Sequence, residues 1–252
     1  MEDIVIRYLE KPDLKEPIFV QGLPGIGNVG KLAAEHLKDE LKATKFAEIY
    51  SKYFPPQVLV MDDGLVRLVQ NELYYVKRGK AKDIVFLVGD YQGLTPDGQY
   101  ELADFVLKEL KKLGVRRVYT LGGYGMGRMV NKPRVLGAAT DPALVKEMEP
   151  HGVVFARGEP GAGIVGASGL LLGLGRAYDM EAVCLMGETS GYFVDPKSAQ
   201  AVLEVLTKVL GIRISFEELE NKAKQIDQIT SKLRDTEGAA EAPPKEDLGY
   251  IG

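Results

Sequence analysis

Apolar and polar positions along this chain follow two repeating patterns. Short apolar runs, typical of buried strands, alternate with longer segments in which apolar residues recur every three to four positions, as on one face of a helix. The runs that predict strands are residues 3–9, 17–20, 46–50, 58–61, 65–70, 73–76, 84–88, 118–121, 136–139, 153–156 and 181–186. The helical pattern covers residues 28–41, 96–112, 142–148, 164–178, 196–210 and 215–234.

This alternation predicts the fold class. Strands separated by helices of this length are typical of an α/β fold, here a largely parallel or mixed twisted sheet with helices on both faces. We expect residues 1–213 to form the α/β domain and residues 214–234 a C-terminal helix, which begins at the capping box Ser215 to Glu218. Residues 235–252 are small, acidic and proline-rich until the last five, which predicts a flexible acidic tail with an apolar tip. Between the strands 65–70 and 73–76, the pair Asn71-Glu72 is expected to form a hairpin turn.

Two short stretches, residues 24–30 and 160–166, share the pattern P-G-x-G-x-V-G. Each contains G-x-G-x-x-G, which in dinucleotide-binding folds lets the backbone approach a pyrophosphate at a helix N-terminus. Such a site needs an acidic residue about 20 residues later, at the end of the next strand, to bind the ribose. Glu48 is the only candidate, and it lies inside an apolar run. We therefore interpret both loops as structural strand-to-helix turns, with anion binding as the alternative.

Composition and charge narrow the class of protein. The chain has 252 residues, is 45% hydrophobic and carries a net charge of −4, which suits one large α/β core and argues against nucleic-acid binding. Its single cysteine, Cys184, lies in an apolar run and predicts a buried thiol in a reducing cytoplasm. The longest uncharged run, residues 160–175, is shorter than the roughly 20 residues of a membrane span, so no membrane partner is expected. The absence of Trp together with 27% charged residues is typical of thermophiles.

The search for catalytic and metal-binding residues gives one alternative function. The two histidines, His36 and His151, have no second ligand at metal-binding spacing, and His36 is expected on the polar side of its helix. Asp90, Glu188 and Ser190 each follow a strand, where doubly wound folds place ligands. They could line the cleft of a small-molecule phosphorylase or hydrolase. No pair has a spacing that chemistry requires, so the favoured hypothesis is a protein without catalysis, metal or cofactor.

Several glycine-rich blocks resemble one known family. Residues 19–30, 122–125, 161–175 and 181–191 are similar to the corresponding segments of archaeal homologues of the proteasome-assembly chaperones, and the resemblance covers about residues 18–210. It implies an α/β fold similar to nucleoside phosphorylases, generally without demonstrated catalysis. It also implies a protein that forms homo-oligomers or pairs with a homologue, and that binds partner proteins.

The resemblance also directs attention to the C-terminus. Chaperones of this kind often end in a hydrophobic residue, a tyrosine and any residue, which dock between proteasome α subunits. Here Tyr250 is third from the end, and we expect Leu248, Tyr250 and Ile251 to bind a proteasome α subunit or a homologous chaperone. Self-association is expected through residues 119–127 and the helix 215–234.

Overall fold

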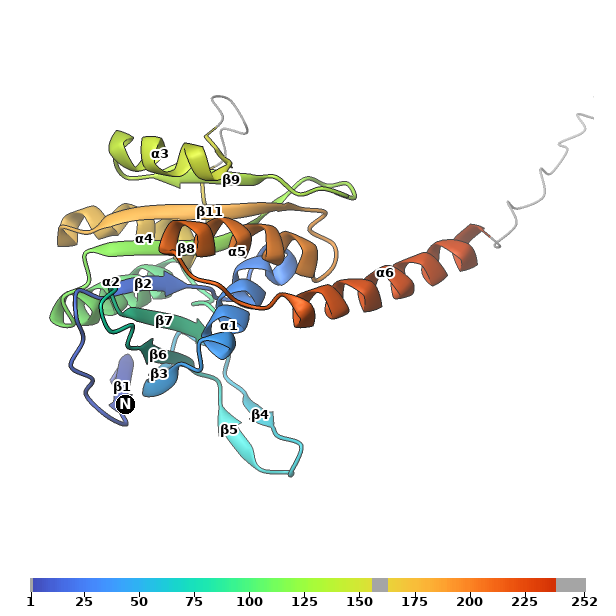
Figure 1. Cartoon of the computed structure of the whole chain (residues 1–252). Coiled ribbons are helices and arrows are strands. Elements are labelled where there is room, and N and C mark those ends of the chain that lie inside the picture. Colours follow the sequence, from blue (N-terminus) through green and yellow to red (C-terminus); the bar gives the residue numbers. More distant parts are fainter. Residues whose placement is uncertain (1, 156–162, 239–252) are drawn as a thin grey trace, which may run out of the picture.

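The computed structural model describes residues 2–155 and 163–238, and these form a nine-stranded mixed sheet covered by helices on both faces (Figure 1). The strands lie in the order β1-β3-β6-β7-β2-β8-β11-β9-β10. The neighbours β7, β2, β8 and β11 run parallel, whereas β1, β3 and β6 pair antiparallel on one side and β9 pairs antiparallel with β11 on the other. The predicted fold class is confirmed. Its strands are β1 Ile4–Tyr8, β2 Ile18–Gln21, β3 Thr44–Ser51, β6 Asn71–Val76, β7 Ile84–Gly89, β8 Arg117–Gly125, β9 Val135–Ala139, β10 Val153–Val154 and β11 Glu181–Thr189.

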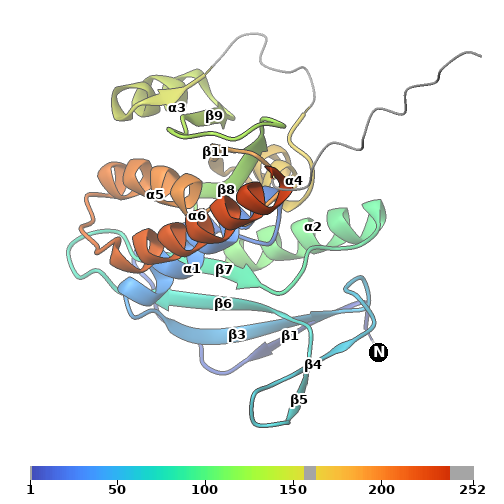
Figure 2. The ribbon, with the colours of Figure 1, turned by 90° about the vertical axis from the view of Figure 1, so that its right-hand side faces the viewer.

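The helices divide the core into two layers of side chains, one on each face of the sheet. Helices α1 and α5 cover one face, and α2 and α4 cover the other, as Figure 2 shows from the side. Along β2 the side chains alternate between them: Ile18 and Val20 pack toward α1 and α5, and Phe19 packs toward α2. The helices are α1 Val29–Glu40, α2 Pro96–Lys112, α3 Pro142–Met148, α4 Ala167–Gly175, α5 Pro196–Leu210 and α6 Glu217–Gly238. Within the described ranges, none of the helices combines the length and the apolar character that a bilayer span requires.

The local signals in the sequence explain most of these boundaries. Thr95 accepts a hydrogen bond from the Gly98 N–H group and so caps α2, and Asp195 caps α5 by accepting one from Ser198. The strand β7 is buried along its whole length, as its continuous apolar run predicts. Helix α4 begins at Ala167, three residues later than expected, because Gly166 adopts a positive φ of 84°.

The predicted hairpin at Asn71-Glu72 is wrong. Both residues lie inside β6, which pairs with β3 on one side and β7 on the other. The hairpin forms earlier, between β4 (Val58–Val60) and β5 (Val66–Leu68), because Gly64 with a φ of 80° supplies the turn after Asp62-Asp63. These two strands form a separate two-stranded ribbon that projects from the body below β3 (Figure 1).

The expectation that His36 lies on a polar, solvated side of α1 is also wrong. The side chain is only 5% exposed, because the segment that joins α5 to α6 passes over it. His36 Nε2 lies 2.7 Å from the carbonyl oxygen of Ser215 and donates to it, and the ring stacks on Phe216 at a centroid distance of 6.3 Å. Ser215 in turn donates its N–H group to Glu40 at the end of α1. The start of α6 is therefore fixed to the body through α1.

Candidate functional site

A cavity of about 930 Å³ opens where the parallel strands β2, β7 and β8 end, the edge at which α/β folds bind ligands. The loops after these strands, together with β9 and the start of α4, form its walls. Both glycine-rich loops contribute to it, so the structure brings together two segments that lie far apart in the sequence. The lining residues that the structure describes are Leu23–Ile26, Gly30, Tyr91–Leu94, Gln99, Leu121–Gly125, Leu136–Ala138, Val154, Gly163–Gly166, Ser168 and Met186.

The cavity wall carries no formal charge among these residues. Its polar groups are the amides of Gln92 and Gln99, two tyrosine hydroxyls, the Ser168 hydroxyl and backbone groups. A diphosphate needs cations to offset its loss of water, and the described lining residues include no Lys or Arg. The lining therefore suits an uncharged ligand or a segment of another polypeptide rather than a nucleotide.

The glycines of the first loop have a packing role. A Cβ atom on Gly30 would lie 2.1 Å from the carbonyl oxygen of Leu121, and one on Gly22 would lie 2.1 Å from the carbonyl oxygen of Gly30. On β8, a Cβ atom on Gly123 would lie 2.3 Å from the carbonyl oxygen of Ile26. These glycines let the backbones of the β2–α1 turn and β8 meet in direct contact. The interpretation of this loop as a structural turn agrees with these contacts.

Glu48 is placed where it cannot serve a nucleotide at this loop. It lies on β3, which is separated from β2 by β6 and β7, a distance of about 14 Å at the usual strand spacing. Its carboxylate accepts hydrogen bonds from Lys45 and Tyr50, each at 3.0 Å, and the residue is 8% exposed in the outer part of the sheet. The ribose-binding acid of a dinucleotide site is therefore missing at this position.

Gln92 joins the two glycine-rich loops across the cavity. Its Nε2 atom donates to the carbonyl oxygen of Pro24 at 2.6 Å, and its Oε1 atom accepts from the N–H group of Ala167 at 2.8 Å. Deeper in the wall, the Ser168 hydroxyl donates to Gln21 at 3.0 Å. These amide contacts were not found from the sequence, because Gln92 belongs to no motif and lies 68 and 75 residues from its partners.

Asp90 lies at the end of β7, and the structure commits it to an ion pair. Both of its oxygens accept from the Arg67 guanidinium, at 2.6 and 2.9 Å, and one also accepts from the Gln70 N–H group at 3.0 Å. Although burial raises the pKa of Asp90, the hydrogen bonds from Arg67 and Gln70 outweigh it and hold the pKa below its ordinary value. The carboxylate fixes the β4–β5 ribbon to the body.

Glu188 and Ser190 lie at the far end of β11 and do not join Asp90. Three strand spacings, about 14 Å, separate β7 from β11. Glu188 is 4% exposed, and its carboxylate accepts from the Arg134 backbone N–H and Nε groups at 3.0 and 2.8 Å. Hydrogen bonding to Arg134 lowers the pKa of Glu188. The Ser190 hydroxyl accepts from the Tyr192 N–H group at 3.3 Å. The cleft that would make these three residues a phosphorylase or hydrolase site is not formed.

Cys184, on β11, is buried, as predicted. Burial raises the pKa of its thiol to about 11, so the group is an unreactive part of the core. Among the described residues, no three His, Cys, Asp or Glu side chains are grouped as metal ligands.

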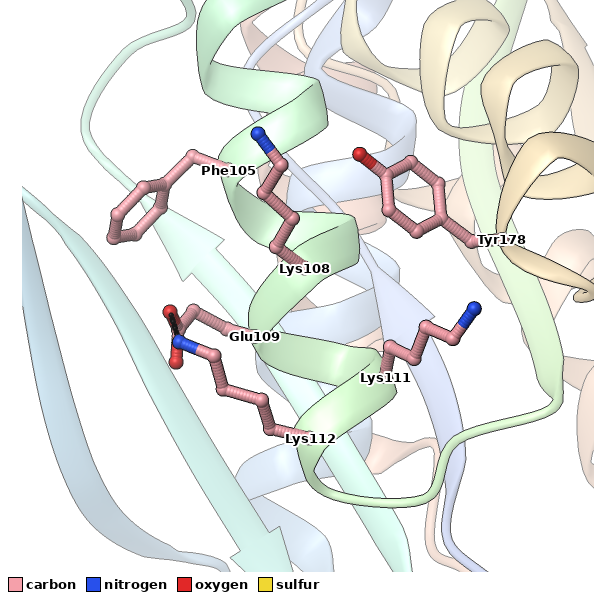
Figure 3. A pocket seen from close by; sticks show the side chains of 6 residues that line it. All are labelled: Phe105, Lys108, Glu109, Lys111, Lys112 and Tyr178. Atoms are coloured by element: carbon pink, nitrogen blue, oxygen red, sulfur yellow. Dashed lines mark hydrogen bonds and ion pairs between the residues drawn. The ribbon is translucent and has the colours of Figure 1, made fainter.

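A second hollow, of about 450 Å³, lies on the outer side of α2 and has a structural explanation (Figure 3). Its charged groups are engaged with neighbours: Glu109 accepts from Lys112 at 2.6 Å and from the Tyr8 hydroxyl at 2.5 Å, and Lys111 pairs with Asp179. Burial, followed by the hydrogen bond to Glu109, raises the pKa of Tyr8. These contacts hold β1 and the turn after α4 against α2.

The expected partner-binding residues Leu248, Tyr250 and Ile251 lie outside the described residues. The expected self-association region, residues 119–127, is only partly a surface: Tyr119 and Leu121 are 2% and 1% exposed in the central strand β8. Groups of exposed apolar side chains occur on the β4–β5 ribbon and around Ile26 and Tyr192 at the sheet edge, and single ones such as Leu94 and Tyr100 occur elsewhere among the described residues.

Comparison with known proteins decides the family. The model of the PAC2 family matches residues 19–234. The chain belongs to the PAC2 family. A Methanocaldococcus jannaschii protein is 42% identical over all of this chain and 99% of its own length. Two solved structures from Pyrococcus furiosus are similar to this PAC2-family chain. PbaB, described as an archaeal proteasome activator, matches with a TM-score of 0.88 and 42% identity over 93% of this chain and 100% of its own. PbaA, described as an archaeal homologue of a proteasome-assembly chaperone, matches with a TM-score of 0.78 and 29% identity over 95% and 94% of the two chains.

The family assignment confirms the resemblance found in the glycine-rich blocks. The matched region extends past the expected one, since it reaches into α6. A likeness to nucleoside phosphorylases stays a prediction.

Proposed function

We propose that this PAC2-family chain is a non-catalytic, cytoplasmic protein-binding scaffold that acts on the proteasome, in the manner of an assembly chaperone, as a homo-oligomer or with a homologous partner. The observation that carries this proposal is the match to PbaB over nearly the whole of both chains. The neutral cavity and the separate, arginine-bound carboxylates of Asp90 and Glu188 support it, because neither offers a reactive group.

The tail is the proposed anchor. Helix α6 extends to Gly238, four residues past the expected end at residue 234. Between it and Leu248, residues 239–247 include no large apolar residue, so the tip cannot be fixed by continuous packing from α6. Ordering a chain segment costs about 1–2 kcal/mol per residue. Burial of an apolar side chain contributes about 1.5–3 kcal/mol, so binding requires Tyr250 and at least one aliphatic neighbour in the partner's pocket.

The test is native mass spectrometry of the full chain with proteasome α subunits and with assembled proteasomes from a related archaeon. We expect a complex with at least one of them. Replacing Leu248, Tyr250 and Ile251 together by Ala should abolish it and leave the thermal midpoint unchanged. The matched control replaces the neighbouring Lys245, Glu246 and Asp247 by Ala and should retain binding.

Two results would contradict this proposal. If the wild-type chain binds neither the α subunits nor the assembled proteasome, the proteasome-related function is wrong. If the apolar-tip variant binds as well as its control, the function survives but the tail is not the anchor.

A further inference from the structure

The β4–β5 ribbon presents most of its apolar side chains to solvent rather than to the body of the protein. Its body-facing residues are Leu59, which packs on the core, and Arg67, which binds Asp90. Its outward face consists of the cross-strand pairs Val58 with Leu68 and Val60 with Val66. These four aliphatic side chains are 49, 53, 72 and 63% exposed, and Met61 and Leu65 at the turn are 45 and 67% exposed.

A two-stranded ribbon with an uncovered apolar face is not stable by itself in water and favours association. Its six aliphatic side chains present on the order of 600 Å² of surface, the upper end of what a monomeric protein exposes in one patch. The turn between the strands carries Asp62 and Asp63, and residues 57–66 hold no Lys or Arg. The ribbon is therefore apolar on its face and acidic at its tip.

A complementary surface lies at the same carboxyl ends of the strands, but beside β8 and β11. We call it the edge patch: Ile26, Met129, Tyr192, Phe193 and Val194, which are 51, 50, 70, 46 and 41% exposed. The structure holds its parts together, since the Tyr192 hydroxyl donates to the carbonyl oxygen of Gly127 at 3.3 Å, and the N–H group of Asp195 donates to the carbonyl oxygen of Gly27 at 2.9 Å.

The edge patch is bordered by positive charge. The segment 122–134 carries Arg128, Lys132 and Arg134 and no Asp or Glu. Arg134 is engaged with Glu188, while Arg128 and Lys132 are exposed. An apolar surface with a basic border thus matches an apolar ribbon with an acidic tip, in both chemistry and sign of charge.

The two surfaces of one chain cannot meet each other. The ribbon is attached beside β7 and projects below β3, whereas the segment 125–135 extends past β8 and β9 at the other end of the row of strands (Figures 1 and 2). Contact between two ribbons would place four aspartates close together, which like-charge repulsion disfavours. The surface that complements both the apolar face and the acidic tip of the ribbon is the edge patch of a second copy.

We infer that copies of this chain associate head to tail, with the β4–β5 ribbon of one copy seated on the edge patch of the next. This inference rests on the self-association in the proposed function. A contact between two different surfaces repeats from copy to copy, so it closes into a ring when the rotation allows. Because the contact joins two different surfaces, each surface can be disrupted in a separate variant.

The first experiment measures the particle mass of the full chain by size-exclusion chromatography with light scattering. We expect the wild type to be larger than 27.6 kDa and two variants, Val60→Asp and the double variant Arg128→Glu/Lys132→Glu, to be single chains. Both change exposed side chains, and circular dichroism should show the wild-type fold. The controls Tyr100→Ser and Glu101→Lys, at exposed positions on α2, should keep the wild-type mass.

The second experiment mixes the two disrupted variants. The Val60→Asp chain keeps an intact edge patch and the Arg128→Glu/Lys132→Glu chain keeps an intact ribbon, so the mixture should form a two-chain particle of twice 27.6 kDa. In a third variant, Asp62→Lys/Asp63→Lys should reduce self-association at least tenfold. Adding Arg128→Glu/Lys132→Glu to that chain should restore it, because both signs are then reversed.

The outcomes separate the two proposals. A wild-type particle of 27.6 kDa would overturn the self-association itself and this interface with it. A larger wild-type particle whose mass survives Val60→Asp and Arg128→Glu/Lys132→Glu would overturn only the interface. If both variants are single chains but their mixture gives no two-chain particle, the contact is not head to tail and the inference is wrong.

Discussion

The packing role of the first glycine loop predicts that Gly30→Ala destabilises the protein. Two effects oppose each other at this position. Because Gly30 lies in α1, alanine would favour the helix by about 1 kcal/mol if nothing else changed. The new Cβ atom, however, would lie 2.1 Å from the Leu121 carbonyl oxygen and 2.7 Å from its carbon, both backbone atoms of the central strand β8.

The contact with Leu121 decides the sign. Backbone atoms cannot rotate away, so α1 must move from the sheet by about 1 Å, and such overpacking costs about 1–3 kcal/mol or more. Because the contact is with backbone atoms, we expect a cost of about 3 kcal/mol, which leaves a net loss of about 2 kcal/mol in the free energy of unfolding after the helix preference is subtracted. For a chain of this size that corresponds to a drop of about 4–8 °C in the thermal midpoint.

The matched control is Gly173→Ala. Gly173 lies inside α4, and a Cβ atom there meets nothing within 4 Å, so only the helix preference remains. We expect this variant to be more stable by about 0.5–1 kcal/mol. Urea unfolding of both variants at one protein concentration measures the two effects. If Gly30→Ala is as stable as Gly173→Ala, the loop is not packed against β8 as described and its glycines need another explanation.

Three further predictions follow from the site. Glu188 has a lowered pKa, so its stabilising effect is present above its ordinary value of 4.5 and is lost as the pH falls through the lower folded value. Glu188→Gln should therefore lower the free energy of unfolding by about 2 kcal/mol at pH 7 and make it fall less steeply as the pH is lowered. If urea unfolding shows the same fall with pH in the variant as in the wild type, this prediction is wrong. His36→Ala removes the hydrogen bond to Ser215 and the contact with Phe216, so amide exchange at the start of α6 should increase about tenfold, whereas exchange in β7 should not change. Calorimetry with NAD, ATP and inorganic phosphate should detect no micromolar binding, and a stoichiometric signal with any of them would refute the structural interpretation of the loop at residues 25–30.

The sequence predicted those parts of the fold that depend on local signals. The continuous apolar run of β7, the caps of α2 and α5 and the buried Cys184 all follow from neighbouring residues. The wrong hairpin shows the limit of such signals, since Asn71-Glu72 resembles a turn but lacks the glycine that a tight hairpin requires. Asp62-Asp63-Gly64 had that glycine, and here the positive φ of Gly64 decided where the chain turned.

Contacts that join distant parts of the chain, in the fold and in the candidate site, were less predictable. His36 and Ser215 are 179 residues apart, and neither position shows in its own neighbourhood that the other will cover it. The same is true of Gln92, whose amide joins the two glycine loops. Asp90 was correctly placed after a strand, whereas Glu188 lies inside β11, which extends to Thr189. The strand order, which the sequence pattern does not give, keeps the two residues three strand spacings apart.

The first glycine loop shows how one motif can serve two kinds of function. Glycine permits close approach of the backbone to whatever lies above the turn, and the motif itself does not specify whether that is a pyrophosphate or another strand. In this chain the space beside Gly30 is occupied by the backbone of β8, and the space beside Gly123 by the carbonyl of Ile26. The tight turn therefore brings Ile26 to the surface, where it is 51% exposed next to Tyr192 in the edge patch. A loop that in a nucleotide-binding fold would face a phosphate here presents an apolar side chain, which favours contact with another protein.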